Sequence, residues 1–216
     1  MLRIDGRLNL DAYTTEQEQL EQIKKWWNEN GKAIVLGLAL GLGGLFGYRY
    51  WEAARLADGQ SASINYEHLL GIAAAGASDE ATAAGEAIID AYPKSTYAKL
   101  SALVLAKLAV DVRNIEEAKK RLQWVIDHSQ AGKIKPVAQA RLAQLLLAEG
   151  KTDDAAALIT QIDSTHALQF AELRGDLHAA QKEREKARAL YSQALAEVRE
   201  RGGNGQSIEL KLDNLN

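Results

Sequence analysis

Residues 102–122, ALVLAKLAVDVRNIEEAKKRL, contain the pattern that predicts how this chain folds. A small residue, Ala106, is followed twelve positions later by Ala118, and four positions after that by a large residue, Leu122. Between them Asn114 precedes two glutamates, which is typical of a turn that leads into a helix with an acidic first turn. The segment is therefore predicted to form two short helices joined by a turn.

The same spacing recurs further along the chain. Two more units repeat it, formed by Ala143, Ala155 and Ile159 and by Gly175, Ala187 and Tyr191. The units are 37 and then 32 residues apart, which brackets the period of about 34 residues of a tetratricopeptide repeat, a helix pair that crosses closely at such small residues. The three units resemble tetratricopeptide repeats, and residues 61–93 are predicted to form a fourth, more degenerate pair.

Composition favours helix throughout. The chain of 216 residues is 47% hydrophobic, with only two prolines and 6% aromatic residues, so we expect an all-α fold. The net charge of -3 suggests no basic surface for a run of phosphates, and nucleic acid is not an expected partner. The absence of cysteine excludes disulfides, thiolate zinc sites and thiol nucleophiles.

Residues 33–48, AIVLGLALGLGGLFGY, contain no charge and predict a helix that spans a lipid bilayer. At about 1.5 Å per residue they cover roughly 24 Å of a hydrocarbon core about 30 Å thick. The flanks supply an aromatic belt at each interface, formed by Trp26, Trp27, Tyr48, Tyr50 and Trp51. The alternative of a buried helix in a soluble core leaves this clustering at the two ends unexplained. A cleaved signal peptide fits poorly, because 32 residues with six acids precede the apolar run.

Glycines inside the span predict close helix packing. Gly37, Gly41 and Gly44 fall on one helical face, which allows another membrane helix to approach closely; the alternative is that glycine is simply common in such spans. For orientation, three lysines precede the span, and only Arg49 and Arg55 follow it before residue 94. This bias favours an N-terminus on the cytoplasmic side.

The predicted architecture is a single N-terminal transmembrane helix followed by a tetratricopeptide-like α-solenoid. The expected segments are a cytosolic tail with a short amphipathic helix (1–31), the transmembrane helix (32–51), a linker (52–60), the repeat domain (61–201) and a C-terminal extension (202–216). Residues 1–12 lack periodicity and are expected to be disordered, and the amphipathic helix is either a lead-in lying at the membrane surface or a docking element. In the extension, Ile208, Leu210 and Leu212 alternate as in a strand, and the segment is expected either to lie back on the last helix pair as a cap or to depend on a partner.

No signature of catalysis is present, so the protein is not expected to be an enzyme or to hold a cofactor. The four histidines, His68, His128, His166 and His178, have no metal-ligand spacing, and no nucleophile elbow or Walker loop occurs. Stacked repeats leave a surface lined by their first helices, which binds peptides or helices. If the register holds, the residues that face this groove are Leu103, Lys107, Gln144, Leu147, Glu172 and Asp176. The alternative is that several of these residues pack inside the fold or form ordinary solvated surface.

Several short motifs around the span carry a family resemblance. The residues concerned are Glu29 to Ala33, the glycine-spaced span, Arg49 to Trp51, Ser61 to Ser63 with Tyr66, and, at the end, Lys211 with Asn214 and Leu215. Together with the repeats, they are similar to the ancillary SecYEG translocon subunit family, called YfgM-like. The resemblance covers the chain from about residue 13 to its end and is most specific around the membrane segment.

The resemblance implies an inner-membrane protein with a cytoplasmic N-terminus and a periplasmic repeat domain. It also implies association with the SecYEG translocon and with a membrane-anchored, PpiD-like chaperone, so that the protein acts as an adaptor or accessory chaperone for polypeptides that emerge in the periplasm. Two alternatives stay open: a scaffold for another envelope complex, and a regulator of an envelope-stress response acting through residues 1–30. The first dozen residues extend beyond the family's usual start, which weakens the regulatory reading.

Overall fold

The computed structural model describes residues 10–130, 132–162 and 170–215, and these residues form helices without any strand. Of residues 1–12, predicted to be disordered, residues 1–9 lie outside this description, whereas residues 10–12 begin helix α1, so the prediction is wrong for them. The chain divides into two units, residues 1–57 and 58–216. One long helix, α1 (Leu10–Ala74), runs through the first unit and enters the second, so residues 52–60, expected to be a linker, are helical.

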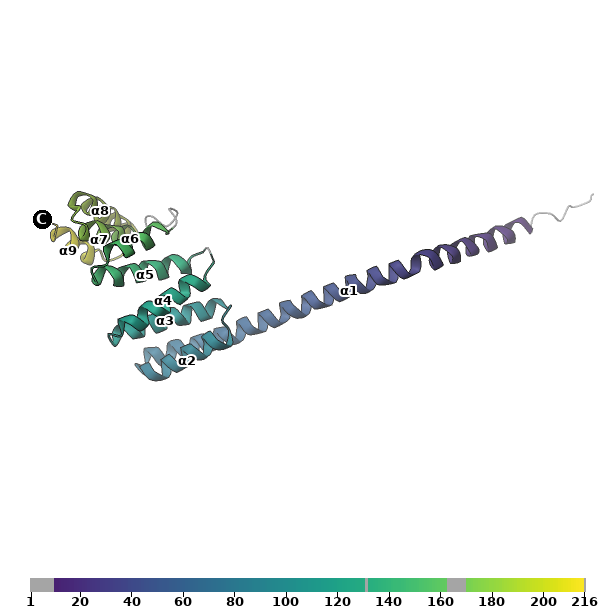
Figure 1. Ribbon diagram of the computed structural model, residues 1–216, viewed down its shortest axis with the longest axis horizontal. Helices are drawn as coiled ribbons and strands as arrows, with labels where there is room; N and C mark the ends of the chain where they lie inside the picture. Colours follow the sequence, from purple (N-terminus) through teal and green to yellow (C-terminus); the bar gives the residue numbers. More distant parts are fainter. Residues whose placement is uncertain (1–9, 131, 163–169, 216) are drawn as a thin grey trace, which may run out of the picture. The chain divides into compact units, whose positions relative to one another are not determined.

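The second unit is a series of short helices that pair along the chain (Figure 1). After α1 come α2 (Ser78–Ala91), α3 (Thr96–Asp111), α4 (Ile115–His128), α5 (Ile134–Ala148), α6 (Thr152–Thr160), α7 (Ala171–Ala180), α8 (Arg184–Glu200) and α9 (Gln206–Asp213). We call the first helix of each pair the A helix and the second the B helix. The A helices are residues 58–74 of α1, then α3, α5 and α7; the B helices are α2, α4, α6 and α8.

The small residues that predicted the repeats lie at the helix crossings. All nine residues of the three predicted units are buried: Ala106, Ala118, Leu122, Ala143, Ala155, Ile159, Gly175, Ala187 and Tyr191. At Gly175 the reason for a small residue is direct, since a Cβ there would lie 2.6 Å from the Tyr191 ring. The repeat register predicted from the sequence is therefore confirmed.

In the fourth, degenerate pair, a large residue stands where the other pairs have a small one, and a small residue stands where they have a large one. At the register position where the other A helices carry a small residue, α1 has Leu69, which is fully buried. The compensating change is on α2, where Gly85 takes the place of the usual large residue, and a Cβ there would lie 2.6 Å from the Leu105 side chain of α3. This pair does not need a large residue on its second helix, because Leu105 of α3 fills the space beside Gly85.

Each A helix ends at the same point of the repeat, with a residue in the left-handed region. These residues are Gly76, Arg113, Gly150 and Lys182, with φ of 80°, 60°, 76° and 64°. A left-handed residue after the last turn lets the next backbone N–H groups reach the final carbonyls of the helix. Glycine adopts it without strain, whereas arginine and lysine do so at a cost. The B helix that follows α3 is capped by Asn114, whose side chain accepts from the Glu117 N–H at 3.2 Å, as the turn chemistry predicted.

Four overlapping cores hold the solenoid together. Each core combines one helix pair with the A helix, or the last helix, that follows: α1, α2 and α3; α3, α4 and α5; α5, α6 and α7; and α7, α8 and α9. A single pair could not bury its apolar faces, so every pair depends on its neighbour. The last core includes Ile208 and Leu215, which are 3% and 8% exposed. The strand-like interpretation of Ile208, Leu210 and Leu212 is therefore wrong, because these residues belong to helix α9, which packs against this core.

Candidate functional site

The A helices share one open face. Along α5 the exposed residues are Arg141, Gln144 and Ala148, whose spacing of three and four places them on a single side of the helix. At the same register, α3 exposes Lys107 and Asp111. We define the A-helix face by the exposed and half-buried residues at this register on α1, α3 and α5: Glu67, Leu70, Val104, Lys107, Val110, Arg141, Gln144 and Leu147.

Three of the predicted groove residues lie on this face. Gln144 is exposed, Leu147 is half-buried, and Lys107 is exposed and pairs with Asp111 at 2.5 Å within α3. Leu103 does not belong with them, because it is only 8% exposed and packs in the core of α3, α4 and α5. Its prediction as a groove residue is corrected, since such a buried side chain has no free surface to offer a partner.

The other two predicted residues, Glu172 and Asp176 on α7, are already engaged by the chain itself. Lys211 from α9 donates to the Glu172 carboxylate at 2.7 Å and to both oxygens of Asp176 at 2.7 and 2.9 Å. The Tyr191 hydroxyl also donates to Asp176, at 2.8 Å, and the Lys211 ammonium lies 5.8 Å from the centre of the Tyr191 ring. Helix α9 therefore covers the part of α7 that corresponds to the open face of α5.

The titration behaviour of this cluster follows from its contacts. Burial alone would lower the pKa of Lys211, but hydrogen bonds to Asp176 and Glu172 outweigh it, so that the pKa is raised. Burial, and then the bond to Asp176, raises the pKa of Tyr191. Lys211 is thus a cation and Tyr191 a neutral donor at neutral pH, and both donate to Asp176.

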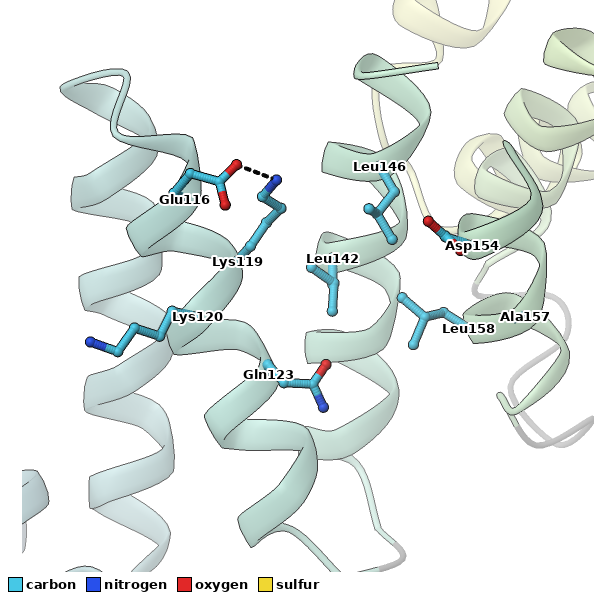
Figure 2. Close-up of a pocket in the computed structure, with 9 residues that line it drawn as sticks. All are labelled: Glu116, Lys119, Lys120, Gln123, Leu142, Leu146, Asp154, Ala157 and Leu158. Carbon is cyan, nitrogen blue, oxygen red and sulfur yellow. Dashed lines mark ion pairs between the residues drawn. The ribbon is translucent and has the colours of Figure 1, made fainter. Parts of the chain in front are cut away.

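A hollow lies between α4 and α6 (Figure 2). Its volume is about 530 Å³, and Leu142 and Leu146 of α5 and Leu158 of α6 form its apolar part. On the α4 side, Lys119 pairs with Glu116 at 2.6 Å and with Glu149 at 2.7 Å, and these bonds raise its pKa. No sequence spacing pointed to this hollow, because three helices contribute to it.

The first unit consists of the N-terminal part of α1. This helix, from residue 18 on, is long and apolar enough to cross a membrane, the only such helix among the described residues. A Cβ built at Gly37, Gly41 or Gly44 would meet no atom within 4 Å, so within this unit the glycine face is open. Whether another helix packs there stays a prediction. Among the described residues, no group of acidic and histidine side chains could hold a metal ion.

Known proteins resemble this chain over most of its length. The tetratricopeptide repeat-like domain family matches residues 24–216, which include both the apolar helix and the repeats. A protein of Escherichia coli (strain K12) named "Ancillary SecYEG translocon subunit" is 31% identical over 183 residues, 84% of this chain and 88% of its own length. The chain belongs to the ancillary SecYEG translocon subunit family.

Further members of the ancillary SecYEG translocon subunit family agree over a greater length. The Aggregatibacter actinomycetemcomitans protein is 32% identical over 94% of this chain and 100% of its own, and the Haemophilus influenzae protein is 30% identical over the same shares. No solved structure matches the chain. The predicted resemblance is therefore confirmed, and the family match extends over the apolar part of α1, all four repeats and α9.

Proposed function

We propose that this protein is an accessory subunit of the Sec translocon, anchored in the bacterial inner membrane by residues 32–51. The observation that carries the proposal is the match to ancillary SecYEG translocon subunits over 84% to 94% of the chain, since it includes both the apolar helix and the repeat unit. The repeat unit supplies an open A-helix face, and the fold around that face consists of packing side chains. A surface of this kind suits binding of polypeptides rather than chemistry.

In this proposal the N-terminus is cytoplasmic and the repeat unit is periplasmic. Three lysines precede the span and two arginines follow it closely, which supports this orientation. The chain lacks cysteine, so single cysteines can be introduced without background. We expect Gln22→Cys to be protected from a membrane-impermeant maleimide in spheroplasts and Asp90→Cys to be labelled. Labelling of Gln22→Cys alone would reverse the orientation.

The proposed partners are SecYEG, a membrane-anchored chaperone of the PpiD-like kind, and polypeptides that emerge from the translocon. The test is recovery of partners from native membranes in mild detergent with a tagged full-length chain. A matched control keeps residues 1–60 and lacks residues 61–216, because the buried core of the repeat unit begins at Ala62 and Leu69. We expect translocon subunits and a periplasmic chaperone to be enriched with the full chain.

The control also tells which part recruits each partner. Translocon subunits retained by residues 1–60 would assign that contact to the membrane helix and its open glycine face, whereas their loss would assign it to the repeats. Enrichment of a different envelope assembly would reject the translocon role and favour a scaffold for that assembly. A regulatory role through the cytosolic tail would require an envelope-stress phenotype from deleting residues 1–30 with the span intact.

A further inference from the structure

We propose that Asn204, in the turn between α8 and α9, is a site of spontaneous deamidation in the folded protein, and that the isoaspartate formed there loosens α9 from the last repeat. Asn204 is followed by Gly205, and the turn they form leads directly into α9. The chemistry needs only water and stands apart from the proposed function.

Deamidation of an asparagine is an attack by the backbone on its own side chain. The nitrogen of the following residue forms a bond to Cγ, its proton is carried by solvent to the amide nitrogen, and that nitrogen leaves as ammonia. Water then opens the resulting five-membered imide at either carbonyl and gives aspartate or isoaspartate, with nothing oxidised or reduced. A following glycine favours ring closure, because it has no side chain and its backbone is the least restricted.

The hydrogen bonds of the turn favour this attack at Asn204. The side chain is exposed, so water and base reach it. Its Oδ1 accepts from the Gln206 N–H at 2.9 Å, and a donor at this place stabilises the negative charge that develops on the oxygen. The Gly205 carbonyl accepts from the N–H groups of Ile208 and Glu209, both at 3.0 Å. In the part of the chain that the structure describes, no acceptor holds the Gly205 N–H, so the attacking nitrogen is available.

The fold itself requires this reactive dipeptide. A Cβ at Gly205 would collide with the Leu195 side chain of α8, so a larger residue there would displace part of the last core. Asn204 is equally specific, because its side-chain oxygen replaces a backbone acceptor for the first N–H of α9. The way α9 is attached to α8 therefore places asparagine before glycine in an exposed turn.

A second Asn-Gly dipeptide, Asn30-Gly31, is a control within the same chain. Both of its residues lie inside α1, where backbone N–H groups belong to the hydrogen-bond ladder of the helix. The Asn30 amide nitrogen donates to the Trp26 carbonyl at 3.0 Å, which directs it toward the preceding turn. Attack by the Gly31 nitrogen requires local unwinding and the loss of these bonds, so we expect Asn30 to react at least about tenfold more slowly than Asn204.

Isoaspartate at position 204 would misplace α9. Its main chain runs through Cβ and Cγ, which adds one atom between the Cα of residue 204 and the Gly205 nitrogen. The packing of Ile208 and Leu215 in the last core, and the bonds from Lys211 to α7, depend on where α9 begins. Aspartate leaves the main chain unchanged and places a negative charge near the start of a helix, where it is favourable. Only the isoaspartate product should therefore destabilise the repeat unit.

The experiment incubates the full-length protein in detergent in mildly alkaline buffer and follows two tryptic peptides by mass spectrometry. Peptide 202–211 contains Asn204 as its only asparagine, and peptide 26–32 contains Asn30. Methylation by protein isoaspartyl methyltransferase identifies isoaspartate, and a synthetic peptide 202–211 gives the rate without the fold. We expect Asn204 to lose its amide in the folded protein while Asn30 keeps it. No conversion of Asn204 while the synthetic peptide reacts, or equal conversion of Asn30, would overturn the site.

Two variants separate the modification from its effect on α9. Asn204→Ser keeps an oxygen acceptor but has no amide to lose, so its Tm should not change on incubation. Asn204→Asp carries the charge of the product on an ordinary backbone, and its Tm before incubation should equal that of fresh wild type. Fully converted wild type should unfold about 2–8 °C earlier than both. Isoaspartate at position 204 with an unchanged Tm, or conversion to aspartate alone, would overturn the effect on α9.

Discussion

Replacing Lys211 by methionine tests the contact that joins α9 to the last repeat. Methionine keeps much of the apolar stem but removes the ammonium that donates to Glu172 and to Asp176 at 2.7 Å. The three side chains are between 23% and 39% exposed, so solvent screens the pairs only in part. A surface pair contributes roughly 0–1 kcal/mol and a charged hydrogen bond up to about 3 kcal/mol. For two partly screened pairs we expect a loss of about 1–2 kcal/mol.

For a repeat unit of this size such a loss lowers Tm by about 2–8 °C. The assay is thermal unfolding followed by circular dichroism, with the full chain in detergent. The matched control is Lys107→Met, which breaks an ion pair within α3 whose partners are 70% and 51% exposed, and which should cost no more than about 0.5 kcal/mol. If Lys211→Met unfolds no earlier than Lys107→Met, the cluster does not hold α9 in place and the reasoning fails.

The same variant has a distinct dependence on pH. The pKa of Lys211 is raised above its ordinary value of 10.5 in the folded state. A raised lysine pKa stabilises the fold fully below the unfolded value and loses that contribution as pH rises through the folded value. Wild-type Tm should therefore fall more steeply above about pH 10 than Tm of Lys211→Met, while Tyr191 contributes to the fall in both proteins. Parallel curves would show that Lys211 does not titrate with unfolding.

Three further substitutions test individual packing features by the same unfolding assay. Gly175→Ala should destabilise by about 1–2 kcal/mol, because the new Cβ displaces the Tyr191 ring at a cost that exceeds the gain of about 1 kcal/mol in helix propensity; an increase in Tm would contradict the close approach. Ser101→Ala should stabilise by about 1 kcal/mol, since in the described structure its hydroxyl is fully buried without a hydrogen-bond partner. Arg113→Gly should stabilise by about 0.5 kcal/mol, because glycine relieves the left-handed backbone but gains entropy in the unfolded chain; a loss of stability would show that the arginine side chain itself stabilises the fold.

The repeat architecture could be predicted because its register is fixed by local geometry. Two helices that cross closely need a small residue at the contact, so Ala106 with Ala118 and the equivalent pairs mark the crossings in the sequence itself. The first pair was recognised only by its position in the chain. Its Leu69 and Gly85 exchange sizes, and the reason is Leu105 of the next repeat. A contact between repeats is not visible in a pattern read within one repeat.

The groove residues were predicted less well, because register alone does not state which neighbours cover a position. Lys107 and Gln144 are exposed, but Leu103, which precedes Lys107 by one helical turn, is buried by the neighbouring helices. Glu172 and Asp176 are at correct positions for an open face and yet are engaged by Lys211, 35 residues or more away. Exposure at such positions depends on what the chain places over them.

The end of the chain does lie back on the last helix pair, as one of the two expectations had it, but as a helix and not as a strand. Ile208, Leu210 and Leu212 alternate, but Leu210 is 59% exposed in the structure, whereas Ile208 and Leu215 are buried and Leu212 is half-buried. Ile208, Leu212 and Leu215 follow one another at intervals of four and three residues, which is the spacing of one helical face. Lys211 comes three residues after Ile208 and directly before Leu212, so it lies next to this face and reaches Asp176 of α7. A solenoid needs a terminal element that shields its last pair, and α9 is that element. The same shielding covers the part of α7 that corresponds to the exposed face of α5.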